Sequence, residues 1–130
     1  MVLTPEAIDK LKGKTILVVD DENELREVVS TLFKRAGCTI LEAENGILAR
    51  NQIEKTNVDI VITDVRMSGG DGVELLEWIK KRTGHQPVVI LVTGFADISE
   101  SEALSRGAKA VLAKPFRLQT IVTTVTEAMG

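Results

Sequence analysis

Two adjacent aspartates follow a short apolar run near the start of the chain, within Ile16-Leu17-Val18-Val19-Asp20-Asp21-Glu22. The apolar run is typical of a buried β-strand, yet it ends in like charges. Two unit charges about 4 Å apart repel each other by about 4 kcal/mol at an effective dielectric constant of about 20. A hard divalent cation that prefers oxygen ligands, above all Mg²⁺, would offset this repulsion. Asp20 and Asp21 are therefore candidate metal ligands.

Three further residues with reactive side chains stand at the ends of later apolar runs: Asp64, Thr93 and Lys114. In open α/β sheets, ligands bind beyond the carboxyl ends of the strands, so residues in these positions belong to one edge of the sheet. If the first and third strands are neighbours, Asp64 joins Asp20 and Asp21 in one cleft. Such a cleft suits Mg²⁺, which also accepts phosphate oxygens. The lysine is then either a neutralising ion-pair partner or a cation for a phosphoryl group bonded to one of the acids.

The segments that would position these residues alternate regularly along the chain. Runs rich in β-branched residues, mostly apolar without alternation, favour strands that are covered on both faces of a parallel sheet. We expect strands at 15–19, 39–43, 59–63, 88–93 and 110–113, and helices at 25–36, 46–55, 72–82, 98–105 and 118–129. These strand–helix units predict one doubly wound α/β sheet with helices on both faces, a three-layer sandwich.

The first residues of the chain stand outside this alternation. Thr4-Pro5-Glu6 is typical of a helix N-cap followed by proline at the first helical position, and Gly13 is typical of a helix end. We therefore expect a short N-terminal helical extension over residues 1–13 and a single domain over residues 14–130.

Bulk properties exclude several classes of function. The 130-residue chain has a net charge of −3 and no basic stripe, so we expect no direct contact with nucleic acid. No apolar run approaches the roughly 20 residues of a membrane span, and no signal-peptide pattern opens the sequence, so we expect no membrane contact. The only cysteine, Cys38, excludes an intrachain disulfide. We expect it to be a buried apolar residue in a cytoplasmic protein.

The chain resembles the receiver domain of two-component response regulators from about Lys14 to Met129, which is nearly its whole length. The motifs that carry this resemblance are the acid pair Asp20-Asp21, the lone Asp64, Gly72 in Ser-Gly-Gly-Asp-Gly, Thr93-Gly94, and Lys114-Pro115-Phe116. The resemblance implies a flavodoxin-like (βα)5 fold with a parallel five-stranded sheet of order 2-1-3-4-5. It also implies that the domain over residues 14–130 is a receiver domain.

The resemblance further implies a phosphorylation-dependent signalling switch rather than an enzyme, with self-phosphorylation and self-dephosphorylation as its only chemistry. Asp64 would accept a phosphoryl group from a histidine of a sensor histidine kinase or a histidine phosphotransfer protein. Lys114, followed by a candidate cis-proline bond, would pair with the phosphoryl oxygens, and Thr93 would hydrogen-bond one of them. The implied ligands of Mg²⁺, or of Mn²⁺ in its place, are Asp21, Asp64 and the backbone carbonyl oxygen of Arg66, with Asp20 acting mainly through water.

Among the residues that depart from what is common in that family, three bear on the switch and its lifetime. Val111 stands three residues before the lysine, where many receivers have Tyr or Phe. We therefore expect the signal to pass through backbone shifts in the 93–99 loop and the following helix, not through an aromatic side chain. Arg66 and Phe95 lie two residues beyond Asp64 and Thr93. Because both are large, they should restrict attacking water and slow self-dephosphorylation.

Three other functions are alternatives to the switch. A receiver-like interaction module without phosphotransfer would keep the fold but not the chemistry. A phosphatase of the haloacid dehalogenase class would need Asp-x-Asp after its first strand, where this chain has Asp20-Asp21. A flavin or nucleotide binder is not supported, because the sequence contains neither Gly-x-Gly-x-x-Gly nor Gly-x-x-x-x-Gly-Lys-Ser/Thr, the glycine-rich motifs that bind phosphate groups. The last helix has few charges, so the fourth and fifth helices of the domain would present either a neutral face or a contact surface for a homodimer or an output domain.

Overall fold

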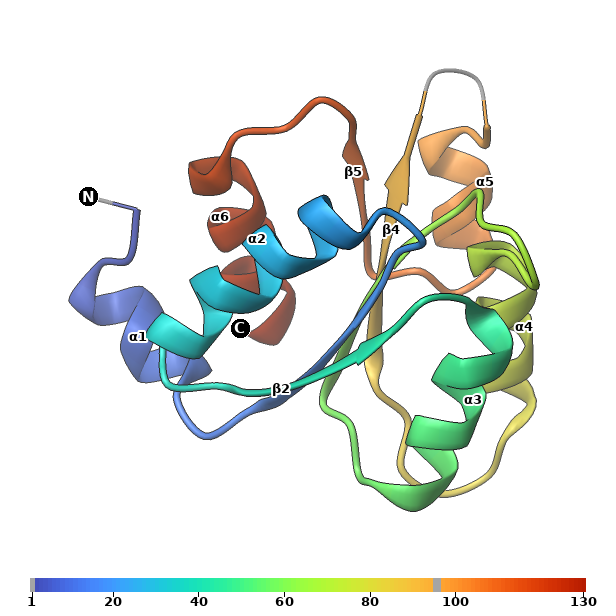
Figure 1. Cartoon of the computed structure of the whole chain (residues 1–130), viewed down its shortest axis with the longest axis horizontal. Coiled ribbons are helices and arrows are strands. Elements are labelled where there is room, and N and C mark those ends of the chain that lie inside the picture. The colour runs from blue at the N-terminus through green and yellow to red at the C-terminus, as the bar shows by residue number, and fades with distance from the viewer. Residues whose placement is uncertain (1, 95–96) are drawn as a thin grey trace.

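The computed structural model describes residues 2–94 and 97–130, and within these residues one all-parallel, five-stranded sheet forms the middle layer (Figure 1). The strands are β1 (Thr15–Val19), β2 (Thr39–Ala43), β3 (Ile60–Asp64), β4 (Val88–Thr93) and β5 (Ala110–Ala113). Their order is β2-β1-β3-β4-β5, which confirms the expected fold class and strand order. β3 lies one residue later than expected. The Asp59 side chain accepts a hydrogen bond from the Thr15 N–H at 2.8 Å, and strand pairing with β1 begins at Ile60.

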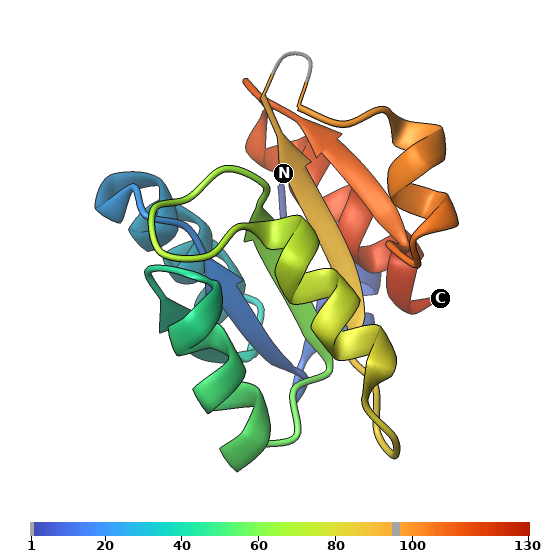
Figure 2. The same ribbon diagram turned by 90° about the vertical axis from the view of Figure 1, so that its right-hand side faces the viewer.

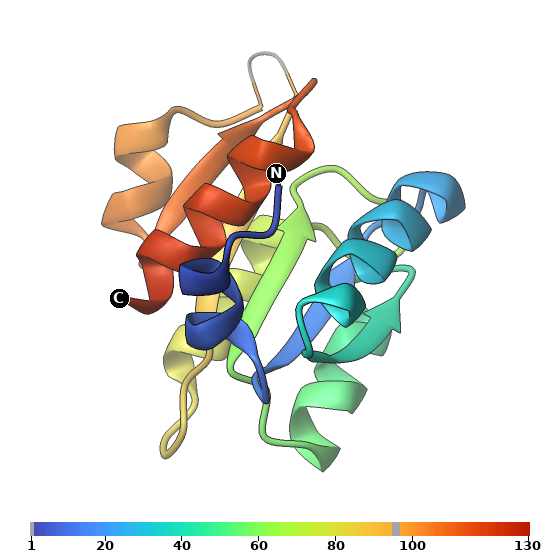
Figure 3. The same cartoon turned by 90° about the vertical axis from the view of Figure 1, so that its left-hand side faces the viewer.

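Helices cover both faces of the sheet. Figure 2 shows α3 (Gly46–Lys55), α4 (Gly72–Lys81) and α5 (Glu100–Ser105) on one face. Figure 3 shows α1 (Pro5–Leu11), α2 (Asn23–Arg35) and α6 (Leu118–Met129) on the other. α5 begins two residues later than expected because Ser99 is its N-cap, with the Ser99 hydroxyl accepting a hydrogen bond from the Glu102 N–H at 3.1 Å. No helix among the described residues has the length and apolar character needed to cross a membrane.

A hydrophobic cluster lies on each face of the sheet, and successive residues of a strand belong to alternate clusters. In β1, Ile16 and Val18 pack under α2 and α6, whereas Leu17 and Val19 pack under α3 and α4. All four side chains are at most 3% exposed. This burial on both faces is why the strand sequences are continuously apolar. Packing on both faces also holds the ends of β1 and β3 in place, and with them the polar residues located there.

The expected N-terminal helix is present as α1. The Thr4 hydroxyl accepts a hydrogen bond from the Ala7 N–H at 3.1 Å, and Pro5 is the first helical residue. Leu11 is fully buried in the cluster under α2 and α6, and α1 packs against α6 (Figure 3). α1 is thus built into the core of this face. The boundary between residues 13 and 14 stays a prediction.

Cys38 is buried, as expected, with 8% of its surface exposed. Its thiol donates a hydrogen bond to the carbonyl oxygen of Leu11 at 3.3 Å, so it helps to join the end of α1 to the turn before β2. Burial raises the pKa of the Cys38 thiol from 9.0 to about 11. The folded protein therefore favours the protonated thiol, and ionisation of this thiol destabilises the fold.

This raised pKa predicts a specific loss of stability in alkali. The folded state holds the Cys38 proton more tightly than the unfolded chain does. The protonated thiol therefore contributes fully to the free energy of unfolding below pH 9.0, and this contribution is lost as the pH rises to about 11. We expect the free energy of unfolding, measured with urea, to fall more steeply over this window in the wild type than in Cys38→Ala. Lysine titration affects both proteins alike, so equal slopes for the two would contradict the prediction.

Candidate functional site

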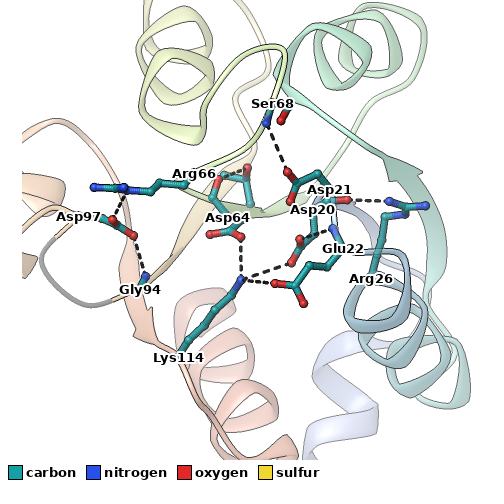
Figure 4. A network of polar contacts seen from close by, with 11 residues as sticks. Asp20, Asp21, Glu22, Arg26, Asp64, Arg66, Ser68, Gly94, Asp97 and Lys114 are labelled. Carbon is teal, nitrogen blue, oxygen red and sulfur yellow. Dashed lines mark hydrogen bonds and ion pairs between the residues drawn. The ribbon is translucent and has the colours of Figure 1, made fainter.

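Three carboxylates gather at the carboxyl edge of the sheet, where β1 and β3 end (Figure 4). Asp20 and Asp21 follow β1, and Asp64 is the last residue of β3. The parallel pairing of Val19 with Thr63 places these strand ends side by side. One oxygen of each carboxylate lies within 4.8 Å of the others. Asp20 and Asp64 are buried, at 5% and 6% exposed, whereas Asp21 is exposed to solvent.

The donor set of this acidic cluster fits a magnesium ion. Octahedral Mg²⁺ holds oxygen ligands at about 2.1 Å, so its ligands lie roughly 3 to 4 Å from one another. Carboxylate oxygens within 4.8 Å need only small side-chain movements to reach that spacing. Mg²⁺ also keeps several waters, and the exposure of Asp21 leaves room for them. Asp21 is already oriented by the Ser68 N–H, which donates a hydrogen bond to its Oδ2 at 3.3 Å.

Lys114 carries the positive charge nearest to Asp64 in the site (Figure 4). Its Nζ donates a hydrogen bond to Asp64 Oδ2 at 2.7 Å and lies 3.8 Å from both Asp20 Oδ2 and Glu22 Oε1. Burial alone would lower the pKa of Lys114, but the hydrogen bond to Asp64 and the three negative charges outweigh it and raise that pKa. The ammonium group is therefore fully charged at neutral pH. The peptide bond that follows it, Lys114–Pro115, is cis, as expected.

The carboxyl group of Asp20 is buried among other acidic side chains. Burial is the largest influence on this carboxyl and raises its pKa, and the charges of Asp64 and Glu22 act in the same direction. The hydrogen bond from the Glu22 N–H at 2.9 Å and the charge of Lys114 lower the pKa of Asp20 but do not cancel the rise. An additional cation beside Asp20 would favour its charged form. A metal ion held by the three carboxylates would be such a cation.

Two residues that support the cluster were not among the candidates from sequence. Glu22 contacts Lys114 directly, and the only sequence signal for it was its place after the acid pair. Arg26, one turn into α2, donates a hydrogen bond from Nη1 to the backbone carbonyl of Asp20 at 2.6 Å. It also pairs through Nε with Glu42 at 3.1 Å. Arg26 therefore holds the end of β1 in place without touching the carboxylates, and no pattern in the sequence indicates this contact.

Thr93 and Gly72 border the acidic cluster on its other sides. Thr93 ends β4, next to the pair formed by Asp64 and Val92, and is 5% exposed. Gly72 begins α4, and its N–H donates a hydrogen bond to the carbonyl oxygen of Val65 at 2.9 Å. The candidate residues at the ends of β1, β3, β4 and β5, as far as the structure describes them, therefore lie at one edge of the sheet. They are Asp20, Asp21, Asp64, Thr93 and Lys114. An acidic cluster, a hydroxyl and an ammonium group in this arrangement can hold a phosphoryl group.

Comparison with known proteins identifies the family. The family model described as the response regulator receiver domain matches residues 16–126. This chain belongs to that family. The receiver is 34% identical over 113 residues to the regulatory protein VanRc of Enterococcus gallinarum, covering 87% of this chain and 48% of that protein. It is likewise 34% identical over 116 residues to the DNA-binding transcriptional regulator NtrC of Escherichia coli K12, covering 88% and 24%. The receiver thus spans about half of one relative and a quarter of the other.

Solved structures of receivers share this fold. A putative response regulator from Chloroflexus aurantiacus superposes with a TM-score of 0.80 at 31% identity, covering 91% of this chain and 98% of that one. A response regulator receiver domain protein from Clostridium thermocellum superposes with a TM-score of 0.78 at 31% identity, covering 89% and 94%. The resemblance inferred from the motifs is therefore confirmed for both the family and the fold.

The three departures noted in the sequence have different outcomes in this receiver. Val111 is half-buried in β5, pairs with Leu91 of β4 and packs on the cluster under α3 and α4. Arg66 is highly exposed and extends towards Asp97 in the segment after β4 (Figure 4). Phe95 lies outside the described residues. The expected slow self-dephosphorylation and the signal path without an aromatic switch stay predictions.

Proposed function

We propose that this receiver domain is a phosphorylation-dependent switch whose phosphoacceptor is Asp64. The observation that carries the proposal is the surroundings of that carboxylate. One oxygen accepts a hydrogen bond from Lys114 at 2.7 Å, and Asp20 and Asp21 lie close enough to share a metal ion with it. The donor would be a phosphohistidine of a sensor histidine kinase or of a phosphotransfer protein. The phosphorylated domain would then control a downstream partner.

The chemistry follows from the charges in the site. A carboxylate oxygen of Asp64 attacks phosphorus, the phosphorus–nitrogen bond of the phosphohistidine breaks, and the imidazole leaves. The attack brings negative oxygens together, so their charge must be neutralised. Lys114 supplies one positive charge from its position against Asp64. Mg²⁺, or Mn²⁺ in its place, held by Asp20, Asp21, Asp64 and the carbonyl oxygen of Arg66, would supply Lewis-acid stabilisation of the phosphoryl oxygens.

The change of state needs more than one new contact. Phosphorylation places acceptor oxygens at the end of β3, next to Thr93, a buried residue at the end of β4. A hydrogen bond to a charged group is worth about 1.5–3 kcal/mol. Moving an equilibrium from 1:99 to 99:1 takes about 5.5 kcal/mol. Thr93 alone therefore cannot switch the domain, and the contact with Lys114 and rearrangement of the loops must supply the rest.

The face formed by α5, β5 and α6 is the proposed contact surface for a second copy or an output domain. Leu104 of α5 is 44% exposed and lies beside Val111, Lys109 and Ala128 in a shallow groove. Glu100 and Glu127 also line this groove, and an exposed apolar residue flanked by charged ones favours contact with another protein. We also propose a cytoplasmic location, which the single, unpaired and buried Cys38 supports.

Metal binding should be measurable without any phosphodonor. At a hundredfold excess over its dissociation constant, Mg²⁺ is expected to raise the free energy of unfolding by about 2.7 kcal/mol, because it binds the folded cluster only. Asp21→Asn should reduce this gain, since it removes a charged ligand at an exposed position where packing is not disturbed. Thermal unfolding at increasing Mg²⁺, with K⁺ at matched ionic strength as the control, measures both. An equal gain in the two proteins would contradict binding at the cluster.

Incubation with a small acyl phosphate and Mg²⁺, followed by intact-mass measurement, tests the function itself. We expect the wild type to gain the mass of one phosphoryl group and to lose it again after the donor is removed. Chelation of Mg²⁺ should prevent the gain. A wild type that stays unmodified with saturating donor and Mg²⁺, while still folded, would overturn the proposal in favour of an interaction module without phosphotransfer.

A further inference from the structure

Asp97 joins the two loops that border Asp64 (Figure 4). Its Oδ2 accepts a hydrogen bond from the Gly94 N–H at 2.9 Å, and its Oδ1 forms an ion pair with the guanidinium of Arg66. Gly94 directly follows Thr93, and Arg66 is two residues beyond Asp64. One carboxylate thus ties the segment after β4 to the segment after β3. None of the roles proposed above uses this contact.

The burial of the two partners is unequal, and this decides which of them depends on the contact. The side chain of Asp97 is 6% exposed, whereas that of Arg66 is 79% exposed. A buried carboxylate that loses its donors is strongly destabilised, while an exposed guanidinium is solvated by water. Asp97 can therefore occupy this position only while Gly94 and Arg66 satisfy it. If either donor finds another acceptor, the position of Asp97 becomes unfavourable.

Gly94 permits the close approach of the carboxylate. A Cβ atom at this position would lie 3.1 Å from Asp97 Oδ2, which is tighter than an ordinary contact. With glycine there, the carboxylate reaches the backbone N–H directly. Asp97 is also two residues before Ser99, the N-cap of α5, so it lies close in the chain to the start of that helix.

We propose that Asp97 is a positioning residue that holds this receiver in its unphosphorylated arrangement and is displaced when Asp64 is phosphorylated. This inference rests on the proposed function. A phosphoryl group on Asp64 presents negatively charged acceptor oxygens at the sheet edge that carries Gly94 and Arg66. Its charge repels the Asp97 carboxylate, and its oxygens compete with Asp97 for the Gly94 N–H. Release of Asp97 removes a restraint two residues before Ser99, the N-cap of α5, and so allows the start of that helix to shift.

The test is the amide resonance of Gly94 in ¹⁵N-labelled protein, recorded without a phosphodonor and with beryllofluoride and Mg²⁺, which mimic an acyl phosphate. In unmodified Asp97→Ala we expect this resonance to move along the line that joins the free and the beryllofluoride-bound wild type. Loss of a hydrogen bond to a charged group should raise the population of the released arrangement by about tenfold or more. Asp97→Asn keeps an oxygen for Gly94 but loses the charge that pairs with Arg66, so its shift should be smaller and in the same direction.

Glu100→Gln is the matched control. It removes the same charge from the exposed first turn of α5, so a general effect of net charge would appear in it as well. We expect its Gly94 resonance to coincide with that of the wild type. If Asp97→Ala fails to fold, as judged by circular dichroism, the nearly isosteric Asp97→Asn decides the question.

The outcomes separate this inference from the proposed function. If beryllofluoride with Mg²⁺ leaves the spectrum of the wild type unchanged, the proposed function is overturned, and this inference with it. A wild type that responds, with Asp97 variants whose Gly94 resonance stays at the free position or leaves the line, overturns the role of Asp97 alone. A shift along the line in the Asp97 variants and none in Glu100→Gln supports it.

Discussion

Replacing Asp64 with asparagine is expected to abolish phosphoryl transfer to this receiver. The amide keeps the size and shape of the carboxylate, but its uncharged oxygen is not a nucleophile for phosphorus. The substitution also removes the negative charge that pairs with Lys114 at 2.7 Å and one of the three carboxylates of the cluster. With a small acyl phosphate and Mg²⁺, the intact mass of Asp64→Asn should therefore stay at that of the unmodified chain while the wild type gains one phosphoryl group.

A second aspartate on the same strand segment provides the control. Asp59 precedes β3 at the opposite edge of the sheet, where its Oδ2 accepts the Thr15 N–H at 2.8 Å. Asp59→Asn makes the same chemical change and keeps an oxygen for that hydrogen bond, so it should be phosphorylated like the wild type. If Asp64→Asn took up a phosphoryl group at the wild-type rate, the acceptor would have to be another residue, and the assignment of Asp64 would be wrong.

Gly72→Ala should damage the same site through the backbone. A Cβ atom at Gly72 would overlap the carbonyl oxygen of Asp64 and would lie 3.0 Å from its carbonyl carbon and 3.2 Å from Thr63 Oγ1. The obstacle is backbone, and the Gly72 N–H is itself bonded to Val65, so no flexible side chain can move aside. Overpacking of this kind costs about 1–3 kcal/mol. We expect a loss of that size in the free energy of unfolding, together with slower phosphorylation, because relief of the overlap moves Asp64.

Gly84→Ala separates a displaced Asp64 from a general loss of stability. Gly84 has a φ of +86°, yet a Cβ atom there would meet nothing within 4 Å. Alanine in this left-handed conformation costs roughly 1 kcal/mol through backbone strain alone. Urea unfolding should show a loss in both variants, whereas the rate of phosphorylation should fall only in Gly72→Ala. Equal rates of phosphorylation in the two variants would show that the contact between Gly72 and Asp64 does not position the acceptor.

The local pattern of this sequence was sufficient to predict most of the secondary structure. Strands buried on both faces must be continuously apolar, and four of the five expected strands have the observed bounds. The remaining strand, β3, begins one residue later than expected. At the expected first position, the side chain of Asp59 accepts the hydrogen bond from the Thr15 N–H. The N-cap of α1 was equally predictable from the sequence, because the Thr4 hydroxyl and Pro5 act within one turn of the helix.

The clustering of Asp20, Asp21 and Asp64 depended on strand order, which apolar runs do not encode. Periodicity places each acid at a strand end, but any order of parallel strands would satisfy the same pattern. The order 2-1-3-4-5 came from the resemblance of the motifs to receivers, and the structure confirms it. The sequence therefore supplied the groups of the site, and the family supplied their arrangement.

By itself, the sequence determined the buried strands, the helices between them and the polar residues that end the strands, because burial and periodicity are properties of neighbouring residues. Only the tertiary structure decided which polar groups meet. Glu22 joins the expected ion pair of Lys114 and Asp64, Arg26 holds the carbonyl oxygen of Asp20, and Asp97 contacts Arg66 and Gly94. Such contacts depend on how separate loops converge at one sheet edge, and no periodicity of the chain carries that information.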